Sequence, residues 1–150
     1  MVALIPEIMT QPIHVAIAIL HRNGHFLLQL RDNIPGIIYP GHWGLFGGHL
    51  EPGETPAVAV ERELLEEISY APPTLLEFGC YADDNVIRHV YHAPLTVELN
   101  QLVLAEGWDM GLLTPEQIRQ GSSYSTRADQ VRPLAPPPQQ ILLDFMDRGV

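Results

Sequence analysis

Glutamates and one arginine recur at fixed offsets in the segment from Gly48 to Tyr70, across a glycine turn and the helix predicted to follow it. Carboxylate oxygens are the ligands that hard divalent cations prefer, and a bound cation can offset the negative charge of a phosphate. The spacing is therefore typical of a magnesium-dependent site that cleaves phosphate groups.

The helix that would position these side chains has a clear beginning. Thr55 can cap the free amides of a helix start and Pro56 suits the first helical position, so we predict a helix from there to about Ile68. At about 100° per residue, apolar side chains fall on one stripe and acidic side chains on an adjacent one. The apolar stripe is Ala57, Val60, Leu64 and Ile68, and the acidic stripe is Glu63, Glu66 and Glu67.

The acidic stripe needs a cationic partner. Like charges one helical turn apart repel by about a few tenths of a kcal/mol per pair, which makes an isolated helix less stable. Arg62 can reach Glu66 one turn on, but one guanidinium cannot neutralise all of these carboxylates. A cluster made only of oxygen ligands suits magnesium, with manganese as a substitute.

At these residues the chain resembles the Nudix hydrolase family. The family's box begins with a glycine, a glutamate and an arginine-glutamate pair, and continues with an aliphatic residue, two glutamates, a glycine and an aliphatic residue. The matching residues here are Gly48, Glu54, Arg62, Glu63, Leu64, Glu66 and Glu67. Ser69 and Tyr70 depart from the last two positions. The glycine lies where a helix ends in a left-handed turn, so Ser69 should reshape the helix exit without removing a metal ligand.

The resemblance implies both a fold and a set of roles. The fold is α/β, the Nudix α/β/α sandwich around a mixed β-sheet. Magnesium would be bound by Glu63, Glu66 and Glu67, with the Gly48 carbonyl as a further ligand, while Glu54 and Arg62 brace them. The general base would be either Glu66 or Glu106, and Glu106 is also a candidate metal ligand from a later loop. Asp109 is the fallback for that base.

Substrate contacts are predicted outside this set, with Arg31, Phe46 and Phe78 as the main candidates. Arg31 ends a predicted strand and could meet a phosphate, as an arginine does in MutT-type members. Phe46 and Phe78 could stack on a base, as could Trp43 and Trp108, although aromatic residues in strands are more often part of a core.

The order of elements predicts strands mixed with helices. Ile13 to Leu20 and Phe26 to Arg31 form a hairpin around an Asn-Gly turn, Asp32 to His42 is a loop, and Trp43 to Phe46 is a short strand. A second hairpin runs from Leu75 to Ala82 and from Val86 towards Leu99, with a bend at Pro94. Thr114-Pro115 opens a short helix, Arg132 to Pro138 is irregular, and Gln139 to Asp147 forms a terminal helix.

Size and composition limit the remaining possibilities. The 150 residues, 46% hydrophobic and 17% charged, suit a single globular domain over residues 1–150, as a monomer or homodimer. Val15 to Leu20 is too short to span a bilayer and no basic segment precedes it, so we expect a soluble, cytoplasmic protein. A net charge of −10 argues against a nucleic-acid polymer or a membrane surface as partner. Cys80, the single cysteine, is expected to be a buried thiol.

These observations predict a magnesium-dependent pyrophosphohydrolase whose substrate is a small nucleotide, with a nucleoside triphosphate converted to the monophosphate and pyrophosphate. One alternative substrate is a nucleotide sugar or ADP-ribose. A second alternative is a non-catalytic nucleotide-sensing module with the same fold. A purely structural acidic helix would leave the glycine turn unexplained.

Overall fold

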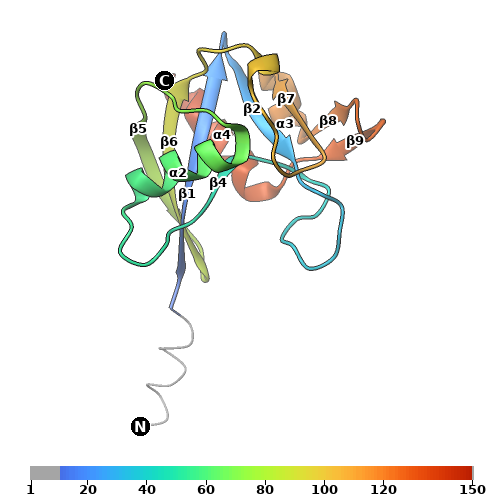
Figure 1. Ribbon diagram of the computed structural model, residues 1–150. Helices are drawn as coiled ribbons and strands as arrows, with labels where there is room; N and C mark the ends of the chain where they lie inside the picture. The colour runs from blue at the N-terminus through green and yellow to red at the C-terminus, as the bar shows by residue number, and fades with distance from the viewer. Residues whose placement is uncertain (1–10, 150) are drawn as a thin grey trace.

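The computed structural model describes residues 11–149, which form one mixed β-sheet with helices on both faces and a separate two-stranded hairpin (Figure 1). The strands are β1 (Ile13–Arg22), β2 (His25–Leu30), β3 (Trp43–Gly44), β4 (Phe46–His49), β5 (Leu76–Ala82), β6 (Val86–Pro94), β7 (Asp109–Leu113), β8 (Ser122–Ser125) and β9 (Gln130–Pro133). The helices are α2 (Pro56–Ile68), the short 3-10 helix η1 (Leu99–Gln101), α3 (Pro115–Gln120) and α4 (Pro136–Arg148).

Strand β1 is the centre of the sheet. It pairs antiparallel with β2 and with β4, and parallel with β6, whose other edge pairs with β5. Strand β2 also pairs antiparallel with β7 and β3. This mixture of parallel and antiparallel pairs confirms the predicted mixed sheet.

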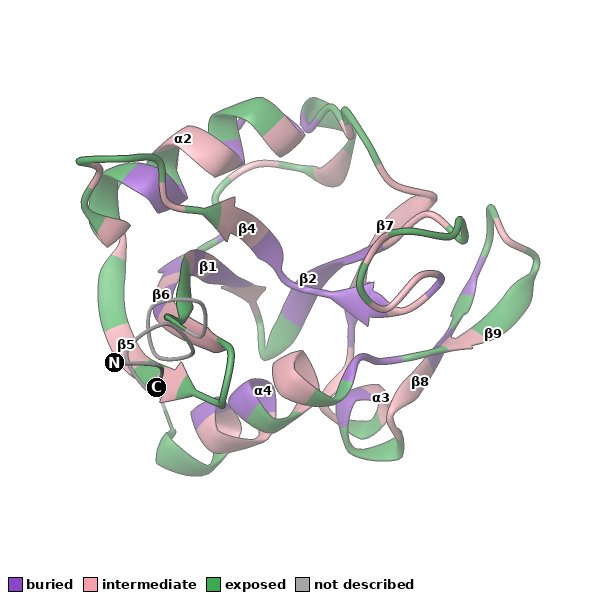
Figure 2. Cartoon of the chain, turned by 90° about the horizontal axis from the view of Figure 1, so that it is seen from below, coloured by how far each residue is buried: buried purple, intermediate pink, exposed green. Residues whose placement is uncertain are grey.

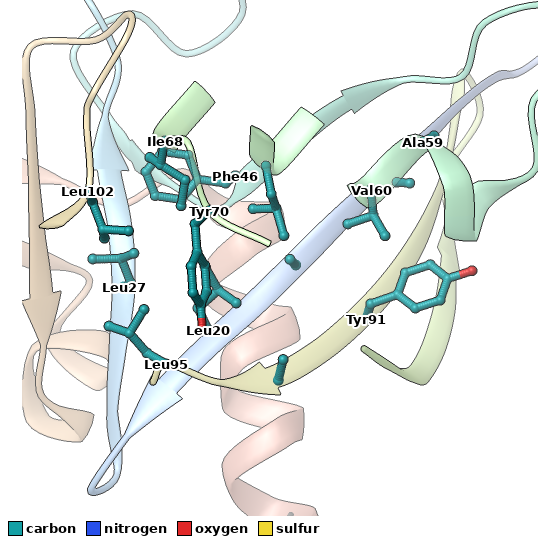
Figure 3. Packing of buried hydrophobic residues seen from close by; sticks show 14 residues of the cluster. Leu20, Leu27, Phe46, Ala59, Val60, Ile68, Tyr70, Tyr91, Leu95 and Leu102 are labelled. Carbon is teal, nitrogen blue, oxygen red and sulfur yellow. The ribbon is translucent and has the colours of Figure 1, made fainter. Parts of the chain in front are cut away.

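The sheet is covered on both faces, because β1 and β2 are buried on both sides. Helix α2 covers one face, where the cluster in Figure 3 packs Val60, Leu64 and Ile68 against Phe46 and Leu20. Helix α4 covers the other face and packs Ile141, Leu142 and Phe145 against that side of the sheet. The burial map in Figure 2 shows the buried residues concentrated between these layers. The α/β/α arrangement is therefore confirmed.

The local signals of α2 act as predicted. The Thr55 side chain accepts a hydrogen bond from the Val58 N–H at 3.3 Å, and Pro56 is the first helical residue. Ser69 ends the helix in the left-handed conformation, with φ 56° and ψ 39°. The Tyr70 ring is buried and its hydroxyl pairs with Thr96 Oγ1 at 2.8 Å, so a tyrosine fills the aliphatic position without leaving a polar group unpaired.

Several predicted details are wrong. Ala57 is exposed, and Ala59 takes its place in the buried stripe. Strand β6 ends at Pro94 and does not reach Leu99, which lies in η1. Helix α4 begins at Pro136, not at Gln139. Prolines are tolerated in the first turn of a helix, because the backbone nitrogens there make no hydrogen bond within the helix.

Two further features differ from expectation. The hairpin β8–β9 was not predicted, and its strands pair with each other outside the main sheet. Cys80 is exposed on β5, not buried. No helix within residues 11–149 is long and apolar enough to cross a membrane.

Candidate active site

The turn between β4 and α2 is built on two glycines that tolerate very close neighbours. Gly47 has φ 143°, and an added Cβ would collide with the Ala16 carbonyl oxygen and lie 2.6 Å from Ile17 Cα. At Gly48 an added Cβ would lie 2.6 Å from the Glu63 carboxylate carbon. Glycine is therefore required at Gly47, whose close neighbours are backbone atoms, and at Gly48 the Glu63 side chain of α2 rests directly against the turn.

Arg62 is the centre of the charge network beside this turn. Its Nε donates to Glu54 Oε2 at 2.7 Å and its Nη2 to Glu54 Oε1 at 2.9 Å, a two-pronged contact. Nη2 also donates to the His49 carbonyl at 3.1 Å, and Nη1 to Glu63 Oε1 at 3.0 Å. The Arg62 guanidinium lowers the pKa of the Glu54 carboxyl to about 2, while Glu54 raises the pKa of Arg62. Arg62 thus fixes the turn and one face of α2 together.

Glu66 is held less firmly than Glu63. Its two carboxylate oxygens lie 3.4 and 3.3 Å from Arg62 Nη1, at the long end of hydrogen bonding, and its side chain is 59% exposed. The Glu66 side chain can therefore rotate away from Arg62 at little cost.

Glu67 is a partly buried carboxylate of the set. The Gly47 N–H donates to Glu67 Oε1 at 2.9 Å, which places Glu67 against the same turn as Glu63. Burial, with a smaller contribution from the nearby Glu63 charge, raises the pKa of Glu67 to about 8, although the Gly47 N–H and Gln29 oppose the rise. A cation bound between these two partly buried carboxylates would offset both their desolvation and their mutual repulsion.

Arg62, Glu63 and Glu67 line a cavity of about 740 Å³, whereas Glu54 and Glu66 are not part of its wall. One wall comes from the turn and α2, with Gly48, Glu63 and Glu67. The remaining walls come from the end of β2 and from two loops, at residues 32–42 and 104–108, and they include Gln29, Arg31, Asp32, Ile34, Ile37, Glu106 and Gly107. The Arg31 Nε is buried and has no hydrogen-bond partner within the described residues. An unpaired buried guanidinium nitrogen beside a cavity suits an anionic ligand.

A family model described as the NUDIX domain matches residues 10–133 of the chain, which is most of its length. The chain belongs to the Nudix family. Its turn and α2 are the Nudix box, and the cavity beside them lies where the box directs its carboxylates.

Known proteins resemble the chain over different lengths. A curated protein of Enterobacter sp. (strain 638), nucleoside triphosphatase NudI, is 44% identical over 50 residues, a match that spans 33% of this chain and 35% of that protein. The crystal structure of a MutT NUDIX hydrolase from Burkholderia pseudomallei aligns with a TM-score of 0.67 at 24% identity and covers 89% of this chain and 97% of that one.

A third similar protein carries a ligand. The NUDIX domain of Shewanella oneidensis NrtR, solved with ADP ribose, aligns with a TM-score of 0.71 at 21% identity and covers 97% of this chain and 93% of that one. At this level of identity the structural likeness establishes the fold. The family match and the hydrolases among these relatives support the prediction of a Nudix pyrophosphohydrolase.

The Nudix box fits a divalent cation, which members of the family generally use. The donors are carboxylate and carbonyl oxygens, and the carboxylates of Glu63 and Glu67 meet at one turn. Within residues 11–149, however, no three acidic, histidine or cysteine side chains already have the arrangement of a metal site. The reason is visible in the network, because Arg62 draws Glu63 and Glu66 towards itself. A cation would have to compete with Arg62 for Glu66, whose contacts are the weaker ones.

The structure brings some predicted residues to the cavity and places others elsewhere. Arg31 and Glu106 both line it. Phe46 is 0% exposed and belongs to the core, so the prediction that it contacts substrate is wrong. Phe78 packs on the α4 side of the sheet, with its ring centroid 5.1 Å from that of Phe145, and it is absent from the cavity wall. The same correction therefore applies to Phe78.

Asp109 is not available as a fallback base. Its Oδ2 accepts a hydrogen bond from the Ser125 Oγ–H at 2.7 Å and its Oδ1 accepts one from the Met110 N–H at 2.8 Å. The carboxylate joins β7 to β8 and does not line the cavity.

Sequence patterns gave no indication of several cavity residues. Gln29 of β2 is 8% exposed, and its side chain lies next to Glu67 of α2. Three further cavity residues, Asp32, Ile34 and Ile37, come from the 32–42 loop. Gln29 interrupts an otherwise apolar strand, and a polar residue at a buried strand position was the one available signal.

Proposed function

We propose that this protein is a magnesium-dependent Nudix pyrophosphohydrolase that converts a nucleoside triphosphate to the monophosphate and pyrophosphate. The observation that carries the proposal is the convergence of the Glu63 and Glu67 carboxylates on the Gly47-Gly48 turn, inside a cavity that also holds the unpaired Arg31 Nε. This arrangement offers cation ligands and an anion-binding group in one space.

The proposed metal ligands are Glu63, Glu66, Glu67, the Gly48 carbonyl and Glu106. Magnesium, or manganese in its place, would offset phosphate charge and make a bound water more acidic. Arg62 keeps Glu54 and Glu63 in place, so its contribution is to hold ligand side chains in a productive orientation. Arg31 would bind a phosphate oxygen through the nitrogen that lacks a partner.

A general base must accept a proton from the attacking water. Glu66 and Glu106 are the two candidates, because both are exposed carboxylates and Glu106 lines the cavity. Replacing each with glutamine tests the assignment. The base variant should lose the acidic limb of its pH–rate profile, while the other variant should keep that limb and change magnesium affinity.

The activity itself is tested with a panel of nucleoside triphosphates, ADP-ribose and nucleotide sugars, with magnesium, with manganese and with EDTA. Products are separated by chromatography, and water labelled with oxygen-18 identifies the phosphorus that is attacked. Glu63→Gln should lose turnover. Glu61→Gln is the matched control, because Glu61 is an exposed glutamate of the same helix outside the cavity wall. Absence of turnover with every nucleotide would overturn the proposal.

The alternatives predict different results in the same panel. Preferential cleavage of ADP-ribose or a nucleotide sugar would move the substrate class, and the NrtR domain solved with ADP ribose is the reason to include these compounds. A nucleotide-sensing module would bind a nucleotide in calorimetry and release no product.

A further inference from the structure

Arg132 of β9 contacts both of the loops that form the cavity walls opposite the Nudix box. Its Nε donates to the Gly41 carbonyl at 2.8 Å, at the end of the 32–42 loop. Its guanidinium carbon lies 5.8 Å from the ring centroid of Trp108, at the end of the 104–108 loop, within the range of a cation–π contact. One side chain therefore joins two segments that are far apart in sequence.

The contact at Gly41 is made where the 32–42 loop closes. The Gly41 N–H donates to the Asp32 carbonyl at 3.2 Å, which brings the two ends of the loop together. Gly41 has φ 67°, and a Cβ there would lie 2.5 Å from Arg132 Nη2, so the guanidinium packs directly on the glycine. Arg132 thus contacts the loop where its two ends meet. The same loop places Asp32, Ile34 and Ile37 in the cavity wall.

The hairpin that carries Arg132 is fastened to the body of the protein. The Trp43 Nε1–H donates to the Ser123 carbonyl at 3.1 Å, and the Ser125 hydroxyl donates to Asp109. Both serines are buried. Figure 2 shows the hairpin at the margin of the molecule, beside β7 and the loops. Strands β8 and β9 pair with each other and not with the main sheet. The hairpin is therefore joined to the rest of the protein through contacts such as these hydrogen bonds.

The chemistry of the 32–42 loop points to the nucleoside part of a substrate. Ile34 and Ile37 offer apolar surface, and the Asp32 carboxylate repels phosphate but accepts hydrogen bonds from N–H groups of a base. Arg31, proposed to bind phosphate directly, comes from the end of β2, and the box carboxylates, proposed to hold the cation, come from α2. A mostly apolar surface with a few polar groups that fix orientation is the usual composition of a small-molecule site, and it suits a nucleobase better than a phosphate.

We propose that Arg132 is a positioning residue that sets nucleotide selectivity by fixing the 32–42 loop against the cavity. This inference rests on the proposed function, since it assigns one wall of the same cavity to the nucleoside. Lysine could not replace Arg132, because an ammonium group cannot donate from the Nε position while its charge lies over the Trp108 ring.

The test compares Arg132→Met and Arg132→Lys with the wild-type protein across the panel of nucleoside triphosphates. For both variants we expect KM for the best nucleotide to rise about tenfold, with kcat within about twofold. The spread of kcat/KM between the best and worst nucleotides should shrink several-fold. Arg127→Met is the matched control, because Arg127 is a mostly exposed arginine of the same hairpin, and its values should stay within about twofold of wild type.

Hydrogen exchange gives a second readout that does not depend on turnover. The Gly41 amide should exchange faster in Arg132→Met than in wild type or Arg127→Met, since the loop closure loses its clamp. Unchanged exchange, or a faster exchange with an unchanged spread of selectivity, overturns the inference. If no nucleotide is turned over, the proposed function fails, and dissociation constants from calorimetry then replace KM. Equal dissociation constants in the variant and the wild type, or no binding at all, also overturn the inference.

Discussion

Among the carboxylates of the candidate site, Glu67 is the one whose pKa is raised. It is partly buried beside Glu63, and desolvation disfavours its charged form. Its pKa rises from an ordinary 4.5 to about 8 in the folded protein, so between these values the folded state binds more protons than the unfolded state. The free energy of unfolding of the metal-free protein should therefore fall as pH rises from 4.5 to 8, to the extent that Glu67 controls it.

Replacing Glu67 with glutamine should separate stability from activity. Glutamine is neutral at every pH, so the metal-free variant should lose this slope and be at least as stable as wild type at pH 8. Turnover should fall about 100-fold or more, because a cation ligand is lost. Urea unfolding at pH 5 and pH 8, together with steady-state kinetics, checks both statements. Turnover near the wild-type level would remove Glu67 from the metal site.

Arg62 acts by geometry as well as by charge. Replacing it with lysine keeps one positive charge but cannot reproduce the paired bonds to Glu54 and the bond to Glu63. We expect kcat/KM to fall about 10- to 100-fold, accompanied by weaker magnesium affinity. Titrating magnesium against activity measures both quantities. An unaltered magnesium requirement would show that the hydrogen bond from Arg62 is not needed to orient Glu63.

At the scale of the element, the backbone strain at the end of α2 lowers the free energy of unfolding by an amount that can be measured. Ser69 has a left-handed backbone that glycine adopts without strain. Ser69→Gly should raise the free energy of unfolding by about 0.5–1 kcal/mol. Ser69→Ala keeps the Cβ and should give no such gain. Thermal and chemical unfolding of both variants and the wild type measure this difference. Equal free energies of unfolding would show that the Cβ of Ser69 does not strain the left-handed turn.

Elements with local signals could be predicted, and those held by distant contacts could not. Helix α2 was predicted within a residue because Thr55 and Pro56 mark its start. The β8–β9 hairpin was missed because its strands lack alternating apolar residues, and it is held by bonds from Trp43 and Asp109 that no local pattern encodes. The sequence predicts an irregular connection at the three prolines before Gln139, whereas in the structure they form the first turn of α4.

The candidate site divides in the same way. The resemblance to the Nudix box implies Glu63, Glu67 and the Gly48 carbonyl as metal ligands, and both carboxylates contact the glycine turn. Residues such as Gln29 and Ile37 reach the cavity through strand pairing and loop packing, which depend on the whole fold. Phe46 was misjudged because a strand residue beside a glycine turn can face either the core or the cavity, and the pleat directs it inward.

At the scale of the whole molecule, cation binding should be linked to folding. A ligand that binds the folded state stabilises it by about 2.7 kcal/mol when its concentration is 100 times Kd. Added magnesium should raise Tm, and the rise should be larger at pH 8.5 than at pH 6, because Glu67 must lose its proton to become a ligand. Differential scanning fluorimetry measures this directly. Glu67→Gln should abolish most of the rise, whereas the same rise in that variant would point to cation binding elsewhere.

The exposed thiol on β5 has a practical consequence for anyone who handles this protein. Cys80 is the single cysteine of the chain and does not line the 740 Å³ cavity. A maleimide dye would attach there alone, outside that cavity. Without a reducing agent in the buffer, air oxidation would join two copies through this sulfur, and that covalent product would be mistaken for a native dimer on a sizing column.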